Sequence, residues 1–303
     1  MSVSFSRELV ILTGAAGGIG TAIARLLAGQ GFALVLVGRR LAPLEAQAAA
    51  LPGGPHSACA ADLTVAADRA RLLGHCRERL QREGAGLAGL VNNAGLAGFA
   101  LLEDLDDARL RRLLETNVLA PIALCRDVLP LLAERPRAAL INIGSTFGSI
   151  GFAGFSGYCA GKFALRGFTQ ALRRELADGP VQVHYIAPRA VATRLNSAAV
   201  DRLNAELGNA VDAPEVVAAA VLAALRDRRG RDRFLGWPEK FFVRLNALLP
   251  GLVDGALRRQ LDAIRRAARE EARVMDSETA LPQVHSPAIH GAERRRPIDG
   301  STS

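Results

Sequence analysis

Aromatic side chains are scarce in this chain of 303 residues: they make up 5% of it, with one tryptophan and two tyrosines. The core must therefore be built mainly from Ala, Leu, Val and Ile. The shortage also leaves no row of stacking platforms of the kind that bind single-stranded nucleic acid. Half of the residues are nonetheless hydrophobic and 30 are glycine, a composition typical of a globular α/β protein.

Cysteine is also rare, and its spacing excludes the common metal and redox motifs. No pair has CxxC spacing among Cys59, Cys76, Cys125 and Cys159. We expect reduced thiols and no bound metal. The sequence also lacks the apolar run of about 18 residues that a membrane span requires, and it shows no secretory signal. These absences predict a cytoplasmic protein.

Lysine is nearly absent, although the chain is strongly basic. The formal net charge is +8, and the 38 basic residues include only two lysines, Lys162 and Lys240. Residues 226–303 supply +5 of that charge. Such a segment can contact nucleic acid or an anionic membrane, although it is more commonly a solvated arginine-rich helix. Because no recognition motif accompanies it, we expect no nucleic-acid partner.

Short apolar runs alternate with longer amphipathic segments along the first 236 residues. The runs lack polar alternation, as strands buried on both faces of a parallel sheet do; they cover 9–12, 33–37, 56–60, 87–92, 139–143, 181–186 and 232–235. Helical patterns lie between them, over 19–28, 41–51, 66–82, 106–133, 157–177 and 214–226. Pro121 and Pro130 are expected to bend or end the fourth of these helices.

This alternation predicts the fold class. Because βαβ crossovers are right-handed, it favours an α/β fold with a doubly wound parallel sheet of the Rossmann type, in three α/β/α layers. We divide the chain into a catalytic domain over 1–236, a C-terminal helical extension over 237–274 and a disordered tail over 275–303.

A glycine-rich turn follows the first predicted strand. Gly14, Gly18 and Gly20 connect that strand to the next helix. A dinucleotide pyrophosphate requires close backbone approach and an open helix N-terminus, and glycine permits both because it has no Cβ. The order of strand, glycine turn and helix therefore predicts a dinucleotide site, which includes Ala16 and Ile19.

An acidic residue is missing where NAD-dependent enzymes usually carry one, at the end of the second strand. The sequence there is Val37-Gly38-Arg39-Arg40. A carboxylate would bind the ribose 2′-hydroxyl of NAD, whereas two guanidiniums suit a 2′-phosphate. We therefore expect NADP(H), bound partly through Arg39 and Arg40, in preference to NAD(H).

Tyr158 and Lys162 stand four residues apart on a predicted helix and so share one face of it. A lysine in a chain that otherwise uses arginine indicates a site that requires a compact ammonium. A phenol has a pKa of about 10, and an adjacent cation favours its phenolate and lowers that pKa. Ser145 follows the fifth strand, at the edge where parallel sheets bind ligands, and its hydroxyl could hold a carbonyl oxygen.

Together these motifs resemble the short-chain dehydrogenase/reductase family, in its shorter-chain subtype. The resemblance covers about residues 8–195 and is carried by Thr13-Gly14-x-x-x-Gly18-Ile19-Gly20, Asp62-Leu63, Asn92-Asn93-Ala94-Gly95, Asn117, Ser145 and Tyr158-x-x-x-Lys162. It implies an NAD(P)-dependent oxidoreductase that acts on CH-OH donors and forms a homo-oligomer.

The resemblance also implies roles for single residues. Asp62 and Leu63 would contact the adenine, and the adenosine ribose would be lined by Asn93, Ala94 and Gly95. The nicotinamide carboxamide would be seated by Pro188, Val191 and Thr193.

Asn117 would complete the catalytic group by holding a water that links Lys162 to solvent. Two positions depart from the family pattern. Arg189 replaces the glycine that usually follows the proline, and Gly17 replaces a basic residue frequent in NADP-dependent members.

Chemistry and resemblance predict the same reaction. Nicotinamide delivers hydride to a carbonyl carbon, and Tyr158 gives the oxygen a proton, with its phenolate as base in the reverse direction. Lys162 would hold the nicotinamide ribose and Ser145 would orient the carbonyl. The alternative is a non-catalytic, NADP-sensing regulator, which would need the cofactor site but not the proton relay.

The substrate side is apolar. Phe99, Leu101 and the segment 147–155 flank the predicted site, and 189–210 could close as a lid. These side chains predict an apolar carbonyl or alcohol as the small-molecule substrate, but they could equally pack the loop or a subunit interface.

The extension carries an apolar stripe at helical spacing, formed by Leu257, Leu261, Ile264 and Ala268, with arginines around it. With Phe241 and Phe242 it could make peripheral membrane contact through residues 241–273. It could equally dock on the domain or on a second subunit.

Overall fold

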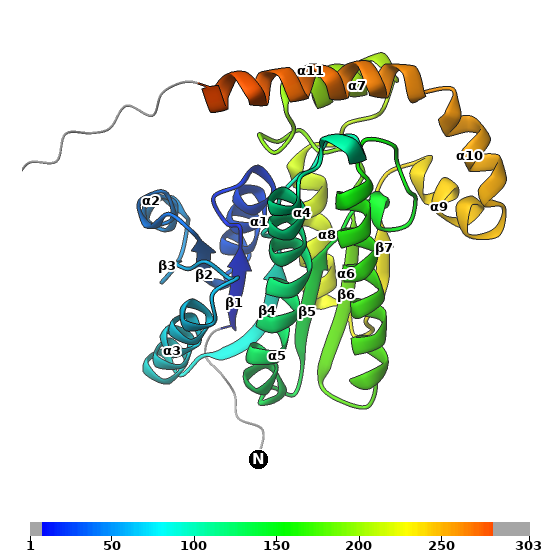
Figure 1. Cartoon of the computed structure of the whole chain (residues 1–303). Helices are drawn as coiled ribbons and strands as arrows, with labels where there is room; N and C mark the ends of the chain where they lie inside the picture. The colour runs from blue at the N-terminus through cyan, green and yellow to red at the C-terminus, as the bar shows by residue number, and fades with distance from the viewer. Residues whose placement is uncertain (1–7, 281–303) are drawn as a thin grey trace, which may run out of the picture.

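A seven-stranded parallel sheet forms the centre of the molecule (Figure 1). The computed structural model describes residues 8–280. The strand order is β3-β2-β1-β4-β5-β6-β7, which reverses direction at β1 as a doubly wound sheet does. The strands are β1 (Glu8–Thr13), β2 (Ala33–Gly38), β3 (Ser57–Ala60), β4 (Gly86–Asn92), β5 (Ala138–Ile143), β6 (Val181–Ala187) and β7 (Asp232–Phe234). The predicted fold class and all seven strands are confirmed.

Helices cover both faces of this sheet. One face packs against α1 (Gly18–Gly29), α2 (Leu41–Ala50) and α8 (Pro214–Arg226). The other packs against α3 (Ala66–Glu83), α5 (Ala120–Ala133) and α6 (Ser156–Glu175). Neighbouring residues of β1 point to opposite faces of the sheet: Val10 packs in the core on the α1, α2 and α8 side, and Ile11 in the core on the α3, α5 and α6 side. Because both faces are covered, the central strands are apolar throughout.

The long helical stretch before β5 is interrupted in an unexpected way. It consists of α4 (Asp107–Leu114), a π-helical segment η2 (Glu115–Leu119) and α5. Pro121 has no N–H to donate to the carbonyl one turn back, and the irregular segment ends two residues before it. Pro130 does not end α5, which continues to Ala133. Asp107–Ala133 is long and apolar enough to cross a membrane by length and composition, but α5 packs against β4 and β5 as a core helix does.

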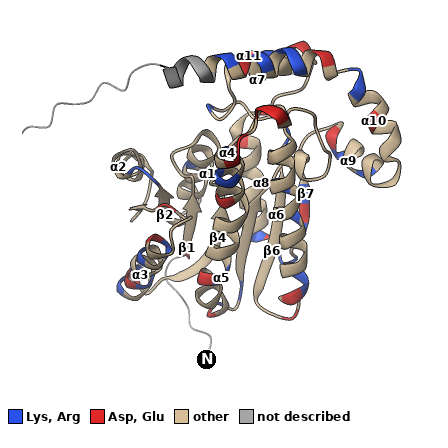
Figure 2. Cartoon of the chain, viewed as in Figure 1, with Lys and Arg blue, Asp and Glu red and all other residues tan. Residues whose placement is uncertain are grey.

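The C-terminal extension arches over the carboxyl ends of the strands (Figure 1). It comprises α9 (Glu239–Leu248), α10 (Pro250–Arg258) and α11 (Leu261–Ala280), and α11 lies along α7 (Ala198–Glu206). The apolar stripe of α11 faces the domain, with Ile264 and Ala268 buried. Ion pairs of Arg202 with Glu270 and of Arg266 with Glu206 bind the two helices along their charged rims (Figure 2).

Among the alternatives left open for this stripe, docking on the domain is the arrangement observed. Helix α11 also extends six residues beyond the predicted end of the extension, into the segment predicted as a disordered tail. The remainder of that predicted tail, 281–303, lies outside the described residues.

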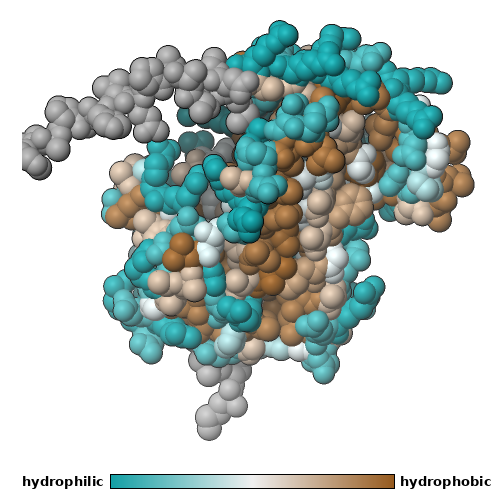
Figure 3. Space-filling model, in the orientation of Figure 1, coloured by the Kyte–Doolittle hydropathy of each residue, from teal (hydrophilic) through white to brown (hydrophobic). Residues whose placement is uncertain are grey.

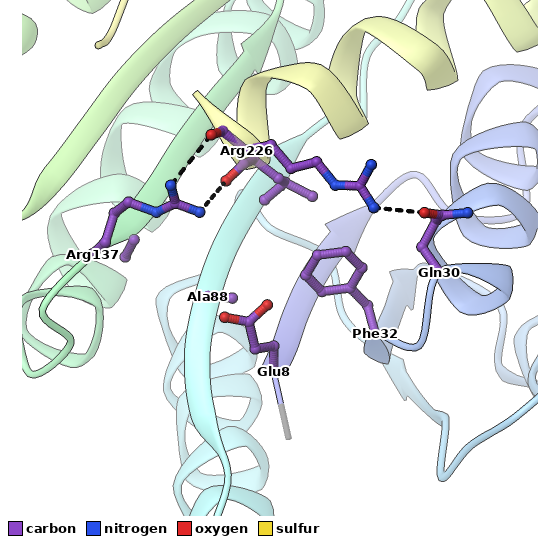
Figure 4. A pocket seen from close by; sticks show the side chains of 8 residues that line it. Glu8, Gln30, Phe32, Ala88, Arg137 and Arg226 are labelled. Atoms are coloured by element: carbon purple, nitrogen blue, oxygen red, sulfur yellow. Dashed lines mark hydrogen bonds between the residues drawn. The ribbon is translucent and has the colours of Figure 1, made fainter. Parts of the chain in front are cut away.

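A small cavity of about 170 Å³ lies at the opposite, amino-terminal edge of the sheet (Figure 4). There the Arg137 guanidinium donates to the carbonyls of Leu225 and Arg226, the last residues of α8, and Arg226 donates to the Gln30 side chain. Basic groups at a helix C-terminus satisfy its unpaired carbonyls. We therefore assign these arginines a structural role.

Candidate active site

The glycine-rich turn between β1 and α1 is closely packed. Gly14 has φ +62°, and a Cβ on it would lie 2.8 Å from the Ala94 Cα. A Cβ on Gly20 would overlap the Gly14 carbonyl oxygen. Helix α1 begins after Gly17 with no side-chain cap and no acidic residue in its first turn. An open helix N-terminus beside closely approaching backbone suits a phosphate group.

Two segments distant in sequence meet this turn. The Thr13 hydroxyl accepts from the N–H groups of Asn93 and Ala94 at 2.9 and 3.0 Å, and the Asn93 amide donates to the Thr13 and Gly14 carbonyls at 3.1 Å each. From the other side, the Thr193 methyl would lie 2.9 Å from a Cβ on Gly18. The predicted adenosine and nicotinamide segments therefore converge on one edge of the sheet.

The remaining predicted cofactor residues stand at the ends of β2 and β3. Arg39 and Arg40 are exposed directly after β2. The Asp62 carboxylate accepts from the Thr64 N–H and hydroxyl at 3.0 and 2.6 Å, which orders the turn after β3. Leu63 is half-buried against the core, and Ala16 is exposed in the glycine turn.

Ser145, Tyr158 and Lys162 line one cavity at the carboxyl ends of the strands. Ser145 precedes the short 3-10 turn Thr146–Gly148, and its Oγ accepts from the Phe147 N–H at 3.2 Å. Tyr158 and Lys162 both lie on α6, and the Lys162 Nζ lies 5.6 Å from the centre of the Tyr158 ring. The same ammonium donates to the carbonyl of Ile143, the last residue of β5, at 3.1 Å.

Burial shifts the pKa values of both groups on α6. Loss of solvent raises the pKa of Tyr158 to about 12, and the Ser145 hydroxyl opposes this shift by hydrogen bonding. Loss of solvent also lowers the pKa of Lys162 to about 8, because it disfavours the charged form. The chain by itself therefore does not lower the pKa of Tyr158 as expected, since the ammonium approaches the ring face and burial dominates.

Asn117 lies buried in the π-helical segment η2. Its Oδ1 accepts from the Leu96 N–H at 2.8 Å, and its Nδ2 donates to the Leu96 carbonyl at 2.9 Å. Gly95 lies between it and Lys162, since a Cβ there would be 3.2 Å from the Asn117 Oδ1 and 3.9 Å from the Lys162 Nζ. π-Turns occur frequently at functional sites, and this one brings Asn117 to the loop beside the ammonium.

The cavity measures about 770 Å³, and its walls are mostly apolar. The predicted aromatic segment lines it: the rings of Phe99, Phe147, Phe152 and Phe155 pack with centroids 4.9 to 6.2 Å apart. Val200 and Leu203 of the predicted lid form another wall. The extension supplies a wall that sequence reasoning missed, made of Phe242, Leu245, Leu252, Val253 and Leu257.

Tyr185 is a further residue that sequence reasoning missed. It is fully buried on β6, and its hydroxyl accepts from the Ser145 N–H at 3.3 Å and donates to the Ser145 carbonyl at 3.2 Å. A Cβ on either Gly144 or Gly148 would overlap the Tyr185 side chain, so both glycines are needed to admit it. Tyr185 thus holds the backbone of Ser145 from behind the site. The small number of tyrosines was the available signal.

Replacing Tyr185 by phenylalanine is expected to lower the free energy of unfolding by about 1–3 kcal/mol, because the part-buried Ser145 N–H loses its hydrogen-bond partner. Turnover should fall about three- to tenfold as Ser145 loses its fixed position, with the KM for the dinucleotide unchanged. Chemical denaturation and steady-state kinetics would measure both effects. Unchanged stability together with unchanged turnover would show that Tyr185 does not position Ser145.

Arg189 explains one departure from the family pattern. Its guanidinium pairs with Asp212 at 2.7 Å and with Glu239 at 3.2 Å, and it donates to the Trp237 carbonyl at 3.1 Å. It therefore ties the loop after β6 to the first turn of α9, and so sets the position of the wall that the extension contributes. Among the described side chains, those of residues 8–274, no group of three or more His, Cys, Asp or Glu could hold a metal ion.

Fold and site define an oxidoreductase of the nicotinamide-dependent class, and comparison with known proteins agrees. The family model for short chain dehydrogenases matches residues 8–204. The chain belongs to the short-chain dehydrogenase/reductase family, whose members interconvert carbonyls and alcohols with NAD(P)(H).

The alignments with similar proteins cover most of this chain and most of each similar protein. A 3-oxoacyl-[acyl-carrier-protein] reductase from Bos taurus is 34% identical over 211 residues, which are 69% of this chain and 87% of that protein. The dehydrogenase/reductase SDR family member 7B from Bos taurus is 32% identical over 257 residues, 80% of this chain and 78% of that protein. A crystal structure of a short-chain dehydrogenase from Streptomyces avermitilis has a TM-score of 0.67 and 28% identity, and the match covers 90% of this chain and 99% of that one.

Proposed function

We propose that this enzyme is an NADP(H)-dependent reductase or dehydrogenase of an apolar carbonyl or alcohol, with Tyr158 as the proton-transfer group. The observation that carries the proposal is the convergence of Ser145, Tyr158 and Lys162 on one wall of an apolar cavity of about 770 Å³. That wall lies at the carboxyl ends of the strands, where the glycine turn and Thr193 also meet.

The residues present fit a dinucleotide. The uncapped N-terminus of α1 and the glycines before it suit the pyrophosphate, while the Lys162 ammonium beside β5 suits the nicotinamide ribose. When bound, the nicotinamide supplies or accepts the hydride. Its oxidised form is a cation, and with Lys162 it would favour the phenolate that burial alone disfavours.

The chain's own groups then perform the proton chemistry. The Ser145 hydroxyl orients the substrate oxygen, and the Tyr158 hydroxyl donates its proton to that oxygen during reduction. In the oxidative direction the phenolate accepts the proton of the alcohol. The Lys162 ammonium holds its charge over the phenol ring, and Asn117 orders the loop beside that ammonium.

The aromatic walls support an apolar substrate. The related bovine reductase is named for 3-oxoacyl groups on a carrier protein, which are carbonyls attached to apolar chains. A non-catalytic NADP sensor is not favoured, because several relatives are named as reductases or dehydrogenases and the whole proton-transfer group is present. The decisive assay follows nicotinamide absorbance with a panel of short- and long-chain carbonyls, with NADPH and NADH in parallel. No oxidation of NADPH with any carbonyl would contradict the proposal.

We also propose a homo-oligomer and a cytoplasmic location. An apolar band covers α4, α5 and α6 on the face shown in Figure 3, and Leu119 of the intervening η2 and Phe163 of α6 are exposed. Such a band on a folded surface marks an interface. The four buried, free cysteines are typical of a reducing compartment.

Removing both guanidiniums after β2 should change cofactor choice. In Arg39→Ala/Arg40→Ala we expect the KM for NADPH to rise at least about 100-fold, because charge-assisted hydrogen bonds to a phosphate contribute about 1.5–3 kcal/mol each. The KM for NADH should hardly change. The exposed Arg25 on α1 provides the control, Arg25→Ala. An equal rise in KM for NADPH and NADH would show that the two arginines do not bind the 2′-phosphate.

A further inference from the structure

The outer surface of α9 and α10 carries a cluster of exposed apolar side chains. We propose that this cluster, called here the α9–α10 patch, docks on an anionic lipid bilayer and admits the apolar substrate from it. The patch comprises Trp237, Phe241, Phe242, Leu248, Leu249 and Leu252, of which Leu248 is 79% and Trp237 is 68% exposed. Figure 3 shows its brown surface at the right-hand end of the molecule, where Figure 1 places α9 and α10. An apolar patch of this kind marks an interaction site.

Charge favours a bilayer as the partner. Lys240, Arg244, Arg258 and Arg259 are exposed on the same two helices and just beyond them. The acidic Glu239 is paired with Arg189, and Asp254 is the other acid between 237 and 260. Tryptophan, phenylalanine and leucine bordered by basic side chains form the composition that binds at the surface of anionic membranes.

The patch is continuous with the substrate cavity. Phe242 and Leu252 are exposed on the outside and also line the cavity, and Leu245, Val253 and Leu257 continue the apolar wall inward. An apolar molecule can therefore pass from the patch to the cavity along an apolar path. A protein seated on the patch would cover this entrance, whereas a bilayer would supply solutes to it. This route rests on the proposed function, since it assumes an apolar substrate.

The structure also shows why α9 and α10, and not α11, provide the contact. The apolar residues of α11 are used in packing, because Ile264 and Ala268 are buried against the domain. Arg189 holds the first turn of α9 through Glu239 and the Trp237 carbonyl. The patch is thus presented by a segment that is fixed to the domain at both ends.

Vesicle flotation tests the proposal without cofactor or substrate. The full-length protein should float at low salt with vesicles of equal parts phosphatidylglycerol and phosphatidylcholine, and much less with phosphatidylcholine alone or at high salt. In Leu248→Ser/Leu249→Ser the partition coefficient should fall at least about tenfold, because two side chains lose their transfer into the apolar interface. Neither leucine lines the cavity.

A matched control carries the same change elsewhere. Val65, just before α3, and Val216, on α8, are exposed away from the patch, so Val65→Ser/Val216→Ser should float like the unchanged protein. Failure of the unchanged protein to float with the anionic vesicles overturns the proposal, as does undiminished flotation of the leucine variant. Light scattering tests whether the patch instead binds a second copy of the chain. An oligomer that the leucine substitutions dissociate would make the patch a subunit interface and overturn the proposal. Because flotation needs no turnover, its failure leaves the proposed reaction standing.

Discussion

Replacing Tyr158 by phenylalanine is expected to lower turnover at least about 100-fold, because general acid–base catalysis typically contributes a factor of about 10²–10⁴. The change removes the only transferable proton on this ring and preserves its shape, so the contacts with Phe147 and Phe155 remain. The KM for NADPH should change little. Turnover with a saturating carbonyl substrate measures the effect.

The pH dependence provides a second readout for the same variant. Burial raises the pKa of Tyr158 to about 12, so the phenolate is scarce at neutral pH unless bound cations favour it. Alcohol oxidation by the unchanged enzyme should therefore accelerate with rising pH, and Tyr158→Phe should abolish that rise. Tyr185→Phe is the matched control, since it deletes the other tyrosine hydroxyl and should cost only three- to tenfold. Turnover of Tyr158→Phe within tenfold of the unchanged enzyme would contradict the assignment.

Features encoded by neighbouring residues could be predicted from the sequence. The strands are continuous apolar runs because both faces of the sheet are covered, and the Tyr158–Lys162 pair shares a helix face through its spacing alone. The glycine turn was also predictable, because Gly14 and Gly20 lie where backbone crowds backbone. In each case the physical constraint acts within a few residues or along one repeating element.

Features that depend on distant contacts could not be predicted in this way. Tyr185 reaches Ser145 across 40 residues, and Arg189 reaches Glu239 across 50. The apolar stripe on α11 was recognisable from its helical spacing. That spacing does not determine whether a bilayer, a second subunit or the domain covers the stripe. The α9 and α10 wall of the cavity was missed for the same reason. These contacts come from the way the elements pack together.

The buried ammonium of Lys162 should cost stability while it serves catalysis. Burial lowers its pKa from 10.5 to about 8, which corresponds to about 3 kcal/mol of unfavourable free energy in the charged form. Lys162→Met keeps the stem volume and removes the charge. We expect its free energy of unfolding at pH 7 to exceed that of the unchanged protein by about 1–3 kcal/mol, and its turnover to fall at least about 100-fold.

The pH dependence of stability distinguishes this account from a simple packing effect. Between pH 8 and 10.5 the unfolded chain binds more protons at Lys162 than the folded protein does, so the stability of the unchanged protein rises with pH across this window. The advantage of Lys162→Met should therefore shrink as the pH approaches 10.5. Lys162→Arg cannot lose its proton and should stay less stable than Lys162→Met throughout. Two results would contradict this explanation: a Lys162→Met variant that is less stable than the unchanged protein at pH 7, or a gain in stability that does not depend on pH. Either would show that the buried ammonium does not lower the stability of the fold.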